Sequence, residues 1–173
     1  MVSVHKSQRT GRVSCDTSLL IALVLALMPI PPWAESFRPN WVGLVLFYWC
    51  MATPERVNVG TGWLVGFILD VLYGSILGLH AFAYSLIAFV TIKSHLKLRM
   101  FPRWQQAAVV FVMLILHQLL VLWVRAAIGK DPENFSYWTP SIVGMVIWPW
   151  LFVILRDVRR RFRVLEFRTL RTD

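Results

Sequence analysis

The stretch that decides the fold is 57–92, VNVGTGWLVGFILDVLYGSILGLHAFAYSLIAFVTI, in which Asp70 is the one acidic residue and no lysine or arginine occurs. A membrane-crossing helix needs about 20 apolar residues, so this stretch holds two spans or a span and a half. Asp70 lies near its middle, flanked by glycines, where a helix break is expected. An acidic side chain at membrane depth is costly and therefore indicates a polar contact inside the protein.

Most of the remaining sequence is equally apolar. Of the 173 residues, 57% are hydrophobic, and the mean hydropathy is +0.60. Further uncharged runs lie at 17–34, 39–54, 104–124 and 134–155. Backbone groups in lipid must bond internally, so the spans are helices, and the alternating pattern of a barrel is absent. The sequence predicts an all-α integral membrane protein.

The net charge of +9 is arranged by topology. Basic residues gather in three clusters: Lys6, Arg9 and Arg12; Lys93, Lys97, Arg99 and Arg103; and Arg156, Arg159, Arg160, Arg161, Arg163, Arg168 and Arg171. The positive-inside rule places all three clusters, and therefore both termini, in the cytoplasm. Such clusters orient helices and contact anionic membrane lipids. We therefore expect lipids, and no nucleic acid, as partners.

The number of spans follows from these clusters. Two ends on one side require an even number of spans between them, which favours spans at about 17–32, 40–53, 57–72 and 77–93 and two more within 104–156. The predicted fold therefore has six transmembrane helices. The second and third are short for a bilayer, so a re-entrant third segment is the alternative. This divides the chain into an N-terminal tail (1–15), a membrane domain (16–163) and a C-terminal tail (164–173).

Small residues recur around Asp70 at every fourth position. They are Gly62, Gly66, Gly74 and Gly78. Small residues let helix backbones approach closely, and packing inside the protein is favoured over a face that binds a partner. Asp70 either caps the helix that follows or has a functional role.

Other candidate binding residues are Arg38 and Asn40, before the second span, and Trp148, Pro149 and Trp150, within the last one. The proline should kink that helix. Its tryptophans are expected either to pack in the core or to form a face toward lipid or a partner. Nucleophile–histidine–acid arrangements, phosphate loops and metal-ligand clusters are absent from the sequence. It therefore predicts no enzyme, metal or cofactor.

Several short motifs occur together in one order. They are FRPNW at 37–41, YW at 48–49, RVNVGTG at 56–62, LD at 69–70, GSILG at 74–78, WQQA at 104–107 and WPW at 148–150. As a set, the series resembles the rod shape-determining MreD family of Gram-negative bacteria.

The resemblance implies a bacterial inner-membrane protein of the cell-elongation machinery, without known catalysis. It implies direct binding to MreC, a bitopic protein, and a link to MreB filaments and to the peptidoglycan polymerase RodA with its transpeptidase partner. It also implies a fold similar to the substrate-binding membrane subunit of energy-coupling-factor transporters.

Three functions follow as hypotheses. The first is a membrane scaffold that binds MreC and helps to position and regulate the peptidoglycan synthase. The second is a small-ligand or lipid-binding membrane module with a transporter-like cavity. The third, an embedded enzyme, needs a second polar catalytic group facing Asp70.

Overall fold

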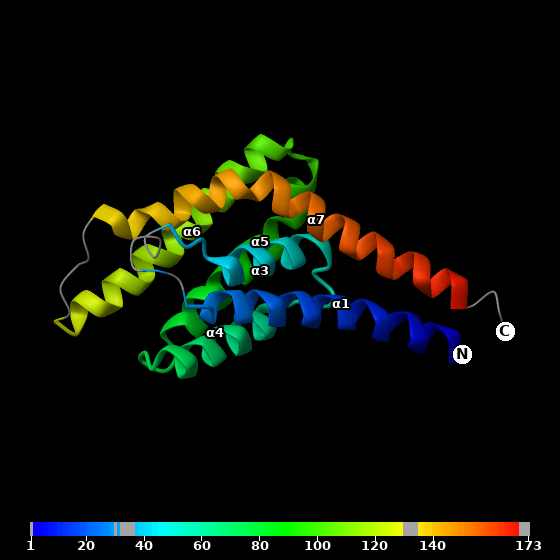
Figure 1. Cartoon of the computed structure of the whole chain (residues 1–173), viewed down its shortest axis with the longest axis horizontal. Helices are drawn as coiled ribbons and strands as arrows, with labels where there is room; N and C mark the ends of the chain where they lie inside the picture. Colours follow the sequence, from blue (N-terminus) through cyan, green and yellow to red (C-terminus); the bar gives the residue numbers. More distant parts are fainter. Residues whose placement is uncertain (1, 30, 32–36, 130–134, 170–173) are drawn as a thin grey trace.

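Helices form nearly all of the computed structural model. It describes the backbone of residues 2–29, 31, 37–129 and 135–169, and the side chains of 15–29, 31, 37–129 and 137–161. The elements are α1 (Val2–Leu27), α3 (Trp41–Ala52), α4 (Val59–Tyr73), α5 (Leu79–Met100), α6 (Arg103–Ala127), the 3-10 helix η1 (Phe135–Trp138) and α7 (Thr139–Thr169). The α-helices pack together, with the start of α1 and the end of α7 at the same end of the bundle (Figure 1).

The all-α class and the number of helical segments are confirmed within the described residues. Helices α5, α6 and α7, the last counted to Arg161, are long and apolar enough to cross a membrane. The apolar part of α1 (Cys15–Leu27), α3 and α4 are shorter. Six crossings, the division into tails and membrane domain, and the likeness to a transporter subunit therefore stay predictions.

Three helices extend well beyond the predicted spans, and one of them, α7, continues to Thr169, within the predicted C-terminal tail. Helix α1 begins at Val2, within the predicted N-terminal tail, and α5 continues to Met100. The last turn of α5 contains Lys97 and Arg99, and cations stabilise a helix C-terminus. Hydrophobicity alone therefore underestimates the length of this helix.

Helix α3 lies at the centre of the bundle, and its residues 42–51 are all buried. It is apolar on every side, which is typical of a helix enclosed by others. Its 12 residues span about 18 Å at 1.5 Å per residue. That is less than the roughly 30 Å of a bilayer's hydrocarbon core.

Side chains satisfy the backbone groups at both ends of α3. At its start, Asn40 Oδ1 accepts a bond from the Gly43 N–H at 2.9 Å. At its end, Arg99 donates to the carbonyls of Met51 (2.9 Å) and Ala52 (2.6 Å). Unpaired helix ends are costly away from water. These caps allow α3 to end inside the protein.

Helices α4 and α5 meet along a seam of glycines. A Cβ at Gly62 would lie 2.9 Å from the Tyr84 carbonyl oxygen, and one at Gly66 would lie 2.5 Å from both the Ala81 Cα and the His80 carbonyl oxygen. The space beside both glycines is filled by the backbone of α5. Gly62 and Gly66 therefore serve packing inside the protein.

This seam predicts a stability effect for Gly66→Ala. The added methyl group meets backbone that cannot move aside, so we expect a loss of about 1–3 kcal/mol. Gly60→Ala is the matched control, because Gly60 is exposed on the same helix. Thermal unfolding of the purified protein in detergent measures both. Equal melting temperatures for the two variants would contradict the seam.

Candidate functional site

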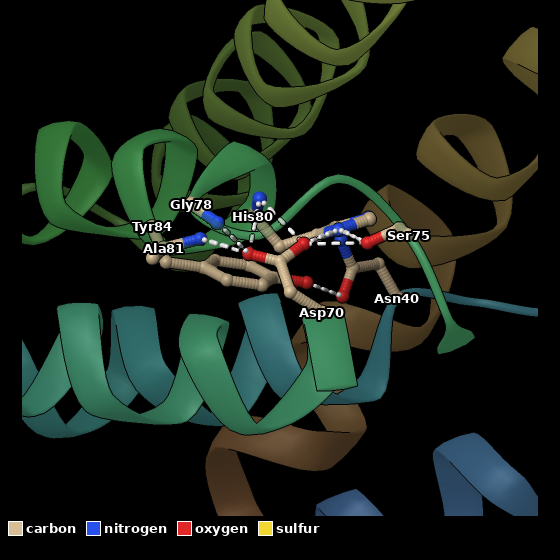
Figure 2. A network of polar contacts seen from close by, with 7 residues as sticks. All are labelled: Asn40, Asp70, Ser75, Gly78, His80, Ala81 and Tyr84. Carbon is tan, nitrogen blue, oxygen red and sulfur yellow. Dashed lines mark hydrogen bonds and ion pairs between the residues drawn. The ribbon is translucent and has the colours of Figure 1, made fainter. Parts of the chain in front are cut away.

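Asp70 is fully buried in the last turns of α4. Its carboxylate accepts backbone N–H bonds from Gly78 (3.0 Å), His80 (3.1 Å) and Ala81 (3.2 Å). It also accepts bonds from Ser75 Oγ (2.6 Å) and His80 Nδ1 (2.7 Å), as Figure 2 shows. Asp70 therefore faces the interior and caps the start of α5, as the position of the acid within an apolar stretch predicts.

The turn between α4 and α5 depends on two further glycines. Gly74 (φ 59°) ends α4, and Gly78 (φ 98°) precedes α5. Both have left-handed backbone conformations that residues with a Cβ rarely adopt. Nothing lies within 4 Å of a Cβ built at either position. The glycines spaced by four therefore divide into two pairs, one for helix contact and one for the turn.

Aromatic and polar side chains extend this network to α3 and α6. Tyr84, one turn after His80, donates its hydroxyl hydrogen to Asn40 Oδ1 at 2.7 Å (Figure 2). The His117 ring of α6 stacks on Tyr84 at 4.6 Å and lies 5.6 Å from the His80 ring, both measured between centroids. Four helices thus contribute to one connected polar centre.

A cavity of about 210 Å³ adjoins this centre. It lies where α1 and α4 end and α3 and α5 begin. Its lining consists of Ala26, Arg38, Pro39, Asn40, Trp41, Val42, Leu69, Tyr73, His80, Tyr84, His117, Gln118, Val121, Arg125, Tyr137 and Pro140. The cavity lining therefore combines polar and apolar side chains.

Arg38 also connects the cavity to the end of α1. Its Nη2 donates to the carbonyls of Leu25 (2.9 Å) and Met28 (3.0 Å). Tyr73 donates to the carbonyl of Ala26 at 3.1 Å. Of the candidates from sequence, Arg38 and Asn40 line the cavity directly, and Asp70 contacts it through His80.

The two tryptophans beside Pro149 have different surroundings. Trp148 is buried and meets the Phe47 ring edge-on at 5.2 Å. Trp150 is 78% exposed on the outside of the bundle. Helix α7 continues through Pro149. Core packing therefore accounts for Trp148, and Trp150 belongs to an outer face.

Sequence reasoning gave no role to His80, Tyr84 and His117. The spacing of His80 and Tyr84 places both on one side of a helix. His117 is a titratable residue inside the uncharged run 104–124. A histidine at membrane depth is unusual, and this is the sequence feature that singles out His80 and His117. Their proximity to Asp70 cannot be inferred from the sequence and becomes visible only in the fold.

The arrangement favours binding over bond-making chemistry. Ser75 and His80 both donate to the same carboxylate, so the hydroxyl of Ser75 stabilises Asp70. A nucleophile activated by histidine needs the opposite order, with the histidine between hydroxyl and acid. No group of three metal-ligating side chains occurs among the described residues.

Fold and site together define a helical membrane protein with a capped acid and a polar cavity in its interior. The family model described as rod shape-determining protein MreD matches residues 7–158. The rod shape-determining protein MreD of Haemophilus influenzae is 33% identical over 145 residues, which are 84% of this chain and 90% of the relative. No solved structure matches the chain. The chain belongs to the MreD family, as its motifs predict, and this family has a role in rod shape determination.

The network around Asp70 predicts contrasting effects of two substitutions. Asp70→Leu leaves buried donors of α5 unpaired, and each costs about 1–3 kcal/mol. We expect Asp70→Asn, which keeps an acceptor oxygen, to lose less. Unfolding in detergent measures both variants against Asp157→Asn, which changes an exposed acid beside Arg156. If Asp70→Leu unfolds like this control, the cap has no energetic role.

Proposed function

We propose that this protein is a non-catalytic scaffold in the inner membrane of the cell-elongation machinery. It binds MreC directly and helps to position and regulate RodA with its transpeptidase partner, in connection with MreB. The observation that carries this proposal is the match of the MreD family model to residues 7–158. A scaffold acts by fixing where its partners lie and in what conformation. It therefore needs an exposed surface and a firmly packed interior, and no reactive group.

An outer face of α7 supports a docking role. Large apolar side chains follow one another at every fourth position and are all exposed: Ile142, Val146, Trp150 and Ile154. A membrane-spanning partner helix packs through such side chains, and tryptophan is a frequent anchor at interfaces. Contact with lipid alone is the alternative for this face.

We therefore expect Val146→Ala/Trp150→Ala to weaken binding of MreC by roughly tenfold or more, as loss of an interface anchor does. Copurification with tagged MreC measures the effect at equal protein abundance. Trp123→Ala is the matched control, since Trp123 is 75% exposed on another helix, α6. If both variants retain MreC equally, the α7 face contacts lipid.

The charge clusters support a topology with both termini in the cytoplasm and six spans. The start of α1 and the end of α7 lie at one end of the bundle, which fits an even number of crossings (Figure 1). In this orientation the cavity opens toward the periplasmic side.

Reporter fusions test this orientation. A fusion at Lys97, in the last turn of α5, and a fusion after Arg163 should both give cytoplasmic signals. The physical reason is that short loops rich in lysine and arginine are retained on that side. A fusion at Gly129, after α6, serves as the periplasmic control. A periplasmic signal at Lys97 would overturn the six-span topology.

A second candidate function is a ligand-binding membrane module. The observation that favours it is the cavity between α1, α3, α4, α5 and α6, which is lined by polar side chains of several helices. This function and the scaffold are compatible, because the α7 face and the cavity involve different residues.

A further inference from the structure

We propose that the cavity binds an oxyanion, a phosphate or carboxylate group, carried by a small molecule or a lipid headgroup. This inference rests on the second candidate function and is independent of the binding of MreC. Three buried nitrogen atoms of cavity-lining residues have no hydrogen-bond partner among the residues that the structure describes: Nδ1 and Nε2 of His117 and Nε of Arg38.

His117 is the strongest part of this observation. Its side chain is held by stacking on Tyr84 at 4.6 Å, and the residue is only 6% exposed. Buried polar atoms in proteins nearly always have partners, so an imidazole with neither nitrogen bonded requires an explanation. A neutral imidazole has one N–H and a protonated one has two. In every state His117 therefore presents a donor that calls for an acceptor.

The positive charge of Arg38 favours a negatively charged acceptor. Nη2 of Arg38 is bonded to the carbonyls of Leu25 and Met28, while Nε–H is buried and unpaired. A guanidinium keeps its positive charge at every physiological pH. These two carbonyls, at the end of α1 and just after it, hold the group in place and carry no net charge of their own. An oxyanion satisfies this N–H and that of His117, and compensates the charge.

His80 favours a hydroxyl beside the oxyanion. Its Nδ1 is bonded to Asp70 at 2.7 Å. The carboxylate is an acceptor, so Nδ1 carries the hydrogen, and Nε2 is left to a ligand as an acceptor in the neutral ring or as a donor in the protonated ring. A hydroxyl group, which can both donate and accept, suits either form. His80 also lines the cavity. A ligand that places an O–H near His80 and its anionic group between His117 and Arg38 uses both kinds of partner.

The volume of the cavity limits the size of the ligand. About 210 Å³ exceeds by far the 10–15 Å³ or so that one water needs, but lies below the range of about 300–1,000 Å³ that is usual for drug-sized ligands. The cavity therefore fits a phosphate with a short polyol better than a large molecule. Glycerol 3-phosphate and the headgroup of phosphatidylglycerol share this chemistry.

The test uses the purified full-length protein and glycerol 3-phosphate as the soluble probe. The decisive variant is His117→Phe, which keeps an aromatic ring against Tyr84 and removes the two unpaired nitrogens. His117→Gln restores a donor. His95→Phe is the matched control, because His95 lies far along α5 and bonds the carbonyl of Ile92.

We expect glycerol 3-phosphate to raise the melting temperature of the wild type and of His95→Phe. We expect His117→Phe to bind it roughly tenfold to a hundredfold more weakly, as loss of a hydrogen bond to a charged group does. His117→Gln should recover part of the affinity. Without probe, His117→Phe should be at least as stable as the wild type, since it removes unsatisfied buried atoms.

A second arm compares nanodiscs of phosphatidylcholine with and without phosphatidylglycerol. If only phosphatidylglycerol stabilises the wild type, and His117→Phe abolishes the effect, the oxyanion comes from a lipid headgroup.

The proposal is overturned if neither probe stabilises the wild type, or if His117→Phe responds fully. Loss of MreC from His117→Phe without binding of either probe would assign the cavity to a protein segment and would also overturn it. Failure of MreC binding in the α7 variants would leave these results unaffected.

Discussion

The structure depends on one buried carboxylate that ends one helix and begins the next. The first N–H groups of a helix have no partners within it, and in a bilayer no water replaces them. Asp70 supplies acceptors for three such groups at the start of α5 and also orients the ring of His80. Because Asp70 closes the turn in this way, α5 runs back against α4. Gly62 and Gly66 have no side chains, so the backbone of α5 can lie directly against them. The placement of His80 and Tyr84 at the cavity follows from that contact.

Much of this architecture could be predicted from the sequence, because apolar runs, prolines and glycines are local signals. The helix break near the middle of 57–92 and the inward position of Asp70 were both accessible in this way. The contact of His117 with Tyr84 was not, because it joins α5 to α6 through packing that no short pattern encodes. The caps on α3 by Arg99, 47 residues away in the chain, were missed for the same reason. In the sequence, Arg99 belongs to a basic cluster that indicates the cytoplasmic side of the membrane. In the structure it also bonds the free carbonyls at the end of α3.

The distribution of polar groups separates two kinds of surface in one small protein. Toward the interior, histidine, arginine and amide side chains converge on a cavity. Toward the outside, α7 presents large apolar side chains. A protein of a shape-determining family needs no reactive centre to influence others, since holding a partner in one place and conformation is sufficient. The ligand and the partner helix that we propose would therefore contact different residues of one fold.

The short central helix has a consequence for biosynthesis. Helix α3 is about 18 Å long by its 12 residues and the helical rise, so it is poorly suited to cross the membrane as an independent unit during translation. The carbonyls at its end are bonded by Arg99 and Arg159, which leave the ribosome much later. Membrane insertion of α3 therefore has to be provisional until α5 and α7 have been synthesised. Translocation machinery that retains early segments beside the nascent chain would protect this helix in the interval.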